Sequence, residues 1–328
     1  MDSRGTSRAK DAEAAKDANA KGDDAARPPE LHALLHKTSR TFALTIPLLP
    51  EPLQTEVATA YLLFRIIDTF EDATRWAVAG RVEALSLFIR LMEGDGHELG
   101  GSVAKWLEVP PLDHAGYLDL LAATPQVVEW HRRLRPAASE VLRAHLVRSA
   151  RGMISIVERT DASGVLQMRT MRELRDYCFV VAGIVGQMLT ELFILQSPSL
   201  ARVGGDLRAR AVEFGEALQL VNILKDVRPD ADEGRIYLPR EASRAEVFQL
   251  ARADLRRAAE YIELLRTAGA AKGTVAFNAL NTRLAIATLR VLRDQGPGAK
   301  LTRLQVTGIA AEVMNAVETG GALFQEMA

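Results

Sequence analysis

Apolar side chains recur along most of this chain at the three- and four-residue spacing that is typical of α-helices. Strand signals are almost absent, because valine and isoleucine are scattered among alanine, leucine, arginine and glutamate. The pattern therefore predicts an all-α protein. The expected helices cover residues 31–37, a long segment from about 51, and then 81–93, 101–107, 113–122, 125–134, 136–159, 170–195, 206–227, 241–268, 274–294 and 300–326.

Capping and helix-breaking residues mark where some of these helices begin and end. Thr170, followed by Glu173, resembles a capping box at the start of a long helix. Pro229 is expected to end the helix that precedes it, because proline cannot continue the helical hydrogen-bond pattern. The chain shows no fixed-period repeat and no internal linker, so residues 29–328 are predicted to form one domain.

The N-terminal residues differ from the rest, because they are rich in charge and alanine and lack the apolar core of a signal peptide. We predict a disordered charged tail over residues 1–28. The longest apolar stretch, Phe179–Leu195, is interrupted by polar side chains, and we interpret it as a buried helix too short and too polar to span a membrane. We expect a cytoplasmic protein and leave open a peripheral contact with the inner membrane face.

The overall charge argues against one class of partner. The chain has 41 basic and 42 acidic residues, whereas nucleic-acid-binding proteins normally carry a basic excess. We therefore expect no nucleic-acid partner. The single cysteine, Cys178, cannot form an internal disulfide, and its apolar neighbours favour a core position over a nucleophile.

A first cluster of carboxylates lies in an apolar helical stretch. Asp68, Glu71 and Asp72 share one face of the helix, because residues three and four apart are neighbours. Arg65 lies one turn before Asp68, and Tyr61 lies one turn before Arg65. Magnesium binds oxygen ligands and usually takes one or two carboxylates together with phosphate oxygens of a substrate. This face therefore predicts a site for magnesium and a diphosphate.

A second cluster follows the same logic more than 140 residues later. Gln219, Asn222, Asp226 and Asp230 form a polar stripe along an otherwise apolar helix. The loop that follows carries Arg235 after a glycine, and its guanidinium could fold over a bound phosphate. Two such clusters that face one cavity would suit magnesium ions and the diphosphates that they carry.

Each cluster also has a simpler interpretation. The first could be an exposed acidic helix end with an intrahelical ion pair, and the second a buried polar ladder at a helix end. Neither cluster has the glycine-rich loop of a nucleoside triphosphatase. Neither supplies the histidine and cysteine ligands of a zinc site.

Four separate blocks, in order over residues 30 to 300, resemble the squalene and phytoene synthase family. The blocks are Ser39-Arg40-Thr41-Phe42, the segment from Tyr61 through Arg65 to Asp68-Thr69-Phe70-Glu71-Asp72, the segment from Tyr177-Cys178 to Gly186, and the stripe Gln219, Asn222, Asp226, Asp230 with the following Gly234-Arg235-Ile236-Tyr237-Leu238-Pro239. Pro229 departs from the family pattern, in which many members place an acidic residue before the last aspartate. This departure leaves two carboxylates in the second cluster.

The resemblance implies a single-domain isoprenoid-synthase bundle, all-α, with a central apolar cavity. It implies the head-to-head condensation of two farnesyl diphosphates to presqualene diphosphate with Mg²⁺, and then reduction to squalene with NADPH. Residues implied in catalysis are Asp68, Asp72, Tyr177, Asp226 and Asp230. Residues implied in substrate binding are Ser39, Arg40, Tyr61, Arg65, Val181, Ala182, Gly183, Gly186, Gln219, Asn222 and Arg235. Residues implied as magnesium ligands are Asp68, Glu71, Asp72, Asn222, Asp226 and Asp230.

Several products remain open at this stage. Dehydrosqualene, presqualene diphosphate or phytoene could be the end product, and a cyclising terpene synthase could use the same fold. NADPH is implied only if the product is squalene, because the chain has no dinucleotide-binding fingerprint. A helical lipid-binding or assembly subunit without activity is the non-enzyme alternative. The sequence does not decide the oligomeric state.

Overall fold

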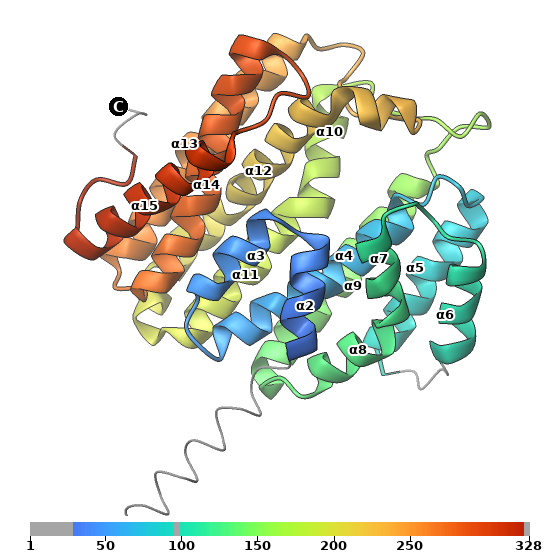
Figure 1. Ribbon diagram of the computed structural model, residues 1–328, viewed down its shortest axis with the longest axis horizontal. Helices are drawn as coiled ribbons and strands as arrows, with labels where there is room; N and C mark the ends of the chain where they lie inside the picture. Colours follow the sequence, from blue (N-terminus) through green and yellow to red (C-terminus); the bar gives the residue numbers. More distant parts are fainter. Residues whose placement is uncertain (1–28, 95–98, 325–328) are drawn as a thin grey trace, which may run out of the picture.

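The computed structural model describes residues 29–94 and 99–324, and the tail predicted for residues 1–28 lies outside this range. The described chain is almost entirely helical, so the predicted all-α class is confirmed. In Figure 1 the N-terminal helices, in blue to green, lie beside the C-terminal helices, in yellow to red. Helices α9 and α11 pack on each other where the two groups meet. The site described below lies between the groups.

The helix and strand bounds follow the apolar periodicity closely. The N-terminal group is α2 (Pro29–Thr38), α3 (Thr41–Thr45), a 3₁₀ turn (Ile46–Leu48), α4 (Leu53–Glu71), α5 (Val78–Met92), α6 (Leu99–Glu108), α7 (Ala115–Ala122), α8 (Thr124–Arg132) and α9 (Pro136–Val157). The C-terminal group is α10 (Met171–Cys178), a π-helical turn (Phe179–Gly183), α11 (Ile184–Gln196), a 3₁₀ turn (Pro198–Val203), α12 (Gly204–Asp232), α13 (Arg244–Thr267), α14 (Lys272–Gln295) and α15 (Arg303–Thr319). Two short parallel strands, β1 (Leu166–Gln167) and β2 (Arg235–Ile236), pair beside α12.

Helix α12 contradicts the prediction that Pro229 ends it. The helix continues to Asp232 and instead kinks at Asp226, where φ is −101° and ψ is 20°. Proline at position 229 removes the hydrogen bond to the carbonyl four residues earlier, which belongs to Lys225. That carbonyl accepts a hydrogen bond from the Gly298 amide at 2.8 Å, so the α14–α15 loop satisfies the freed group. Tertiary structure therefore turns an expected helix end into a bend beside the second acidic cluster.

The long apolar stretch in the middle of the chain also differs from its interpretation. By length and composition alone, the helical segment Met171–Gln196 could cross a membrane, so the judgement that it is too short and too polar was wrong. Half of its most apolar window is buried inside the protein. The π-helical turn at Phe179–Gly183 interrupts it, and such turns often occur at functional sites. Cys178 is fully buried, which confirms its core position.

Two glycines let α11 and α12 approach each other closely. A Cβ added to Gly186 would overlap the carbonyl of Ala211, and a Cβ added to Gly215 would overlap the carbonyl of Ala182. These contacts bring the backbone of α11 against that of α12. Glycine is required here because the neighbouring atoms are backbone atoms that cannot turn away.

A cluster of acidic side chains is buried behind the site, between α10, α12 and α13. Arg175 binds Glu216 through two hydrogen bonds of 3.0 Å, and Glu216 is only 2% exposed. Asp254 is 4% exposed, and its Oδ2 finds no hydrogen-bond partner among the described residues. Burial raises the pKa of Asp254 to about 7; Glu216 and Glu213 add to this rise, whereas Arg175 opposes it.

This cluster predicts a pH-dependent stability effect for Asp254→Asn. In the folded protein the pKa of Asp254 is raised to about 7, above its unfolded value of about 3.9, so the fold loses stability as the pH rises from about 4 to about 7. We expect the variant to be more stable than wild type by about 2 kcal/mol near pH 8.5, and the difference to shrink to a small fraction of this near pH 4. Urea unfolding at both pH values measures it.

The other buried carboxylates titrate in both proteins, so the comparison isolates Asp254. Asp206→Asn is a matched control, because Asp206 is exposed at the start of α12. A stability difference of equal size at both pH values would contradict the assignment of this effect to ionisation.

Candidate active site

Two adjoining cavities lie between the helix groups. The apolar cavity has about 900 Å³ of space, part of it open to solvent, and is lined mainly by aliphatic and aromatic side chains. The polar cavity has about 940 Å³ and is lined mainly by charged and hydroxyl side chains. The lining residues common to both are Arg65, Asp68, Val181, Gln219 and Asn222. A ligand with a charged head and an apolar chain could therefore occupy both.

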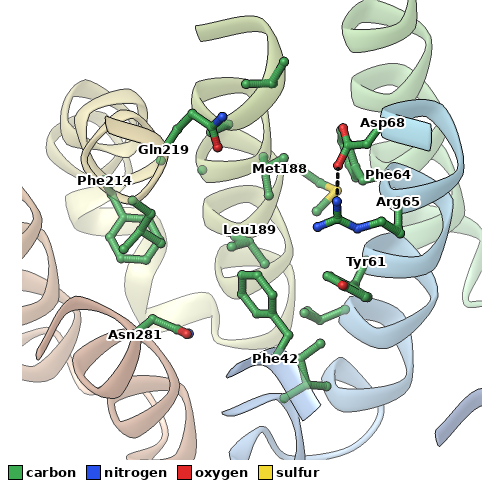
Figure 2. Close-up of a pocket in the computed structure, with 18 of the residues that line it drawn as sticks. Phe42, Tyr61, Phe64, Arg65, Asp68, Met188, Leu189, Phe214, Gln219 and Asn281 are labelled. Carbon is green, nitrogen blue, oxygen red and sulfur yellow. Dashed lines mark ion pairs between the residues drawn. The ribbon is translucent and has the colours of Figure 1, made fainter. Parts of the chain in front are cut away.

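The first acidic cluster lies at the end of α4, where the helical period brings its side chains to one face. Arg65 pairs with Asp68 at 3.5 Å, and Figure 2 shows this pair on the wall of the apolar cavity. Tyr61 lies one turn earlier and donates a hydrogen bond to the carbonyl of Thr38 at 3.0 Å. Asp72 caps the C-terminus of α4 and faces the polar cavity.

The second cluster lies across the polar cavity on α12. Asp226, at the kink of this helix, pairs with Lys225 at 3.1 Å. The Lys225 ammonium also donates to Asn222 Oδ1 at 3.3 Å. Gln219 and Asn222 extend the polar stripe to the apolar cavity. The structure thus turns the whole stripe toward the space that the first cluster faces.

Arg235 joins the two clusters. Its Nε lies 3.3 Å from Asp72 Oδ1 of the first cluster, and its Nη2 lies 3.6 Å from Asp230 Oδ1 of the second. The same Nη2 contacts Glu233 at 2.5 Å. The guanidinium is largely buried, at 9% side-chain exposure, and it follows the glycine turn that leads into β2. In this state, therefore, an arginine side chain partly neutralises the carboxylates that meet here.

Burial and mutual repulsion disfavour the charged form of these carboxylates, in spite of the nearby arginines. Burial raises the pKa of Asp68 to about 7, against the effect of Arg65, and Asp72 adds to the rise. Burial likewise raises the pKa of Asp230 to about 6, against the effect of Arg235. The pKa of Glu71 is raised well above its ordinary value by burial and by Asp72. Such a site favours binding of a cation.

The donor set fits magnesium that keeps water or phosphate oxygens in its shell. In the described part of the chain, no three His, Cys, Asp or Glu side chains form a complete metal-binding group by themselves. Magnesium does not require one, because it commonly takes one or two carboxylates and completes its octahedron with water and substrate oxygens. Glu71 Oε1 is buried and finds no hydrogen-bond partner among the described residues, so it could bind magnesium directly or through a water molecule.

A pair of tyrosines lines the polar cavity. Tyr177, from α10, donates to the Tyr237 hydroxyl at 2.9 Å, and the two rings stack with centroids 4.4 Å apart. Burial raises the pKa of both phenols well above the ordinary value, so both stay protonated. Sequence reasoning named Tyr177 as a site residue but used Tyr237 only as part of a motif.

Some predicted residues line the cavities and others do not. Val181, Ala182 and Gly186 line the apolar cavity as expected. Ser39 accepts a hydrogen bond from the Phe42 amide of α3 at 2.9 Å, and neither it nor the exposed Arg40 is a lining residue. Gly183 packs against Phe179 and Val212 and is not a lining residue either, which agrees with the alternative of close helix packing.

Three further lining residues of the polar cavity, Tyr117, Ile223 and Lys225, were not among the predicted site residues. Lys225 is next to Asp226 in sequence, and its position could have been inferred from the helical period. Tyr117 comes from α7, and nothing in its local sequence marks it. It reaches the cavity only because α7 packs on α4.

The family model for squalene/phytoene synthase matches residues 35–246. The chain belongs to this family. Squalene synthase BSS of Botryococcus braunii is 31% identical over 216 residues, which are 64% of this chain and 42% of that protein. Squalene synthase 1 of Arabidopsis thaliana is 29% identical over 225 residues, which are 65% of this chain and 49% of that protein. The chain thus aligns with less than half the length of these squalene/phytoene synthase relatives.

Solved structures share the fold of this family member. A structure of TcSQS with a ligand superposes with a TM-score of 0.70 at 23% identity, covering 88% of this chain and 85% of that chain. A dehydrosqualene synthase in complex with a ligand gives a TM-score of 0.58 at 19% identity, covering 88% and 96%. At these identities the likeness shows the all-α isoprenoid-synthase fold.

Proposed function

We propose that this protein is a magnesium-dependent prenyltransferase of the squalene synthase type. In this proposal it condenses two farnesyl diphosphates head to head to presqualene diphosphate, and with NADPH it converts this intermediate to squalene. The observation that carries the proposal is the convergence of two carboxylate clusters on a polar cavity that opens into an apolar one. Membership in the squalene/phytoene synthase family supports the reaction type.

The chain's own residues divide the work between the two cavities. Asp68, Asp72, Asp226 and Asp230, with Asn222 and Glu71, would hold Mg²⁺, which supplies positive charge to the diphosphate leaving group. Arg235 and Arg65 lie close enough to contact the same diphosphate, since both line the polar cavity. The cationic side chains and Mg²⁺ together would reduce the repulsion among the carboxylates and between them and the diphosphate.

The apolar cavity would contain the farnesyl chains and exclude water from the reacting carbons. Loss of diphosphate breaks the C1–O bond of one substrate and leaves an allylic cation. The double bond of the second substrate attacks this cation, and loss of a proton closes the cyclopropane of presqualene diphosphate. Val181 and the other apolar wall residues offer no nucleophile to the cation. The neutral Tyr177 hydroxyl, which lines the polar cavity, would steer the cation or assist proton loss.

Incubation with farnesyl diphosphate and Mg²⁺, with and without NADPH, tests the proposal by product mass. We expect squalene with both and no turnover when the metal is chelated. Consumption of substrate without squalene would limit the activity to presqualene diphosphate or dehydrosqualene, and a C40 product from geranylgeranyl diphosphate would indicate phytoene synthesis. A cyclic hydrocarbon from one diphosphate would indicate a terpene synthase. No consumption under any condition would leave the non-enzyme alternative.

The location in the cell belongs to the same proposal. Squalene is a hydrocarbon that partitions into membranes, so an enzyme that makes it would release product most readily at a membrane surface. We therefore retain a cytoplasmic protein with peripheral contact at the inner membrane face. Fractionation of cells that express the full chain, followed by a salt wash of the membranes, tests this.

A further inference from the structure

Tyr117 is a half-buried residue of α7 that reaches the polar cavity from outside the two acidic helices. Its ring centroid lies 5.3 Å from the guanidinium carbon of Arg65. The ring of Tyr61, one turn before Arg65 on α4, lies 5.7 Å from the same carbon. Arg65 is thus within cation–π distance of two aromatic rings, one from its own helix and one from another element.

Arg65 has few other restraints on its orientation. Among the described residues its ion pair is a 3.5 Å contact with Asp68, the Tyr61 hydroxyl is a further polar neighbour, and its Nε is buried without a hydrogen-bond partner. A planar guanidinium with so few directional contacts would otherwise rotate about its long side chain. The aromatic rings therefore restrict its plane and leave its Nη groups available at the junction of the two cavities.

Helix α7 is held in place on both sides of Tyr117. Before the helix, Asp113 accepts a hydrogen bond of 2.8 Å from Arg75, which follows the first acidic cluster in sequence. On the helix, Asp119 pairs with Lys37 of α2 at 2.7 Å. Between them, a Cβ on Gly116 would overlap the backbone carbonyl of Lys37, so glycine permits the close approach of α7 to α2.

The helix start adds a fourth restraint. The imidazole of His114 accepts a hydrogen bond from the Tyr117 amide at 3.3 Å, and the two rings lie with centroids 4.2 Å apart. The contacts of α7 therefore fix the Tyr117 ring relative to Arg65 without using any residue of the acidic clusters.

We propose that Tyr117 is a positioning residue for binding of the substrate diphosphate. The ring of Tyr117 orients the Arg65 guanidinium toward the polar cavity. This inference rests on the proposed function, because it assumes that a diphosphate binds there. The ring, and not the hydroxyl, carries the effect. Phenylalanine at this position should therefore preserve it, and leucine should remove it.

Titration of the full chain with magnesium pyrophosphate tests the inference by calorimetry. We expect Tyr117→Leu to raise the Kd by about tenfold, and Tyr117→Phe to stay within about twofold of wild type. In farnesyl diphosphate turnover, KM should rise in the leucine variant much more than kcat falls. In an Arg65→Lys background, which lacks the planar guanidinium, Tyr117→Leu should have no further effect on the Kd.

Phe248→Leu is the matched control, because it removes an aromatic ring that lies 4.6 Å from the guanidinium carbon of Arg244, and neither residue lines either cavity. We expect it to leave the Kd unchanged. Thermal melting of each variant shows whether α7 has come loose, and Tyr117→Trp keeps an aromatic face if the leucine variant is too unstable to measure.

Three outcomes would overturn the inference. They are an unchanged Kd in Tyr117→Leu, an equal loss in Tyr117→Phe, and a loss that persists in full in the Arg65→Lys background. In each of these cases the proposed function still holds if the wild-type protein binds magnesium pyrophosphate and turns over substrate. Wild-type protein that does neither would end both.

Discussion

Asp226→Asn should reduce the release of pyrophosphate from farnesyl diphosphate by about 10³-fold while the protein remains folded. Asp226 lies at the kink of α12 and faces the polar cavity with 37% side-chain exposure, so the fold does not depend on its burial. Asparagine keeps the shape of the side chain and removes its charge. The loss of rate would then report the charge that holds Mg²⁺ against the leaving group. A continuous pyrophosphate assay at several magnesium concentrations measures the rate and the metal dependence.

Asp206→Asn is the control for this experiment, because Asp206 lies on the same helix at its exposed N-terminal end. We expect wild-type rates from it. Retention of full activity by Asp226→Asn would show that the second cluster does not hold the metal, even if the first one does.

Arg235→Gln should lower the free energy of unfolding of the metal-free protein by about 3 kcal/mol near neutral pH. The Arg235 guanidinium is buried and contacts Asp72 and Asp230, so its removal leaves carboxylates of both clusters without their shared positive partner. Addition of Mg²⁺ should then stabilise the variant more than it stabilises wild type, because the metal would replace the missing charge. Urea unfolding with chelator or with magnesium measures both effects.

The pH dependence gives this prediction a second readout. Asp230 has a pKa of about 6 in the folded protein, above its ordinary value, and Arg235 opposes that rise. Without Arg235 its folded pKa would rise further, so the loss of stability should be largest above pH 6 and should shrink toward pH 4. Arg228→Gln is the control and should show neither effect, because Arg228 is an exposed arginine of α12, the helix that carries Asp230. An equal gain from magnesium in the variant and in wild type would contradict the bridging role of Arg235.

Features that depend only on neighbours along the helix could be predicted from the sequence. The placement of Asp68, Glu71 and Asp72 on one face of α4 follows from the helical period, and the structure agrees. The predicted capping box at Thr170 is confirmed in one of its two hydrogen bonds. The Thr170 hydroxyl accepts a hydrogen bond from the Glu173 amide at 3.1 Å, but the Glu173 carboxylate accepts one from the Arg169 amide instead of the Thr170 amide. Local geometry thus predicts which side chains share a face, and less well which partner each one takes.

Pro229 shows where a local rule is overridden. The rule predicted a helix end, but the α14–α15 loop supplies a hydrogen-bond donor, Gly298, to the carbonyl that proline leaves free. The donor is about 70 residues away in the chain, so no local pattern could reveal it. The resulting kink places Asp226 at the polar cavity.

By itself, the sequence determined that the protein is helical and that two separate helices each carry a carboxylate stripe, because a period of 3.6 residues is a property of the local chain. Only the tertiary structure decided that these stripes face each other across Arg235, and that Tyr117 of α7 lies against Arg65. Those relations depend on close approaches between segments. Examples are Gly116 of α7, which packs against α2, and Gly215 of α12, which packs against the turn before α11. Packing of distant segments sets these distances, and the spacing of residues along the chain carries no record of them.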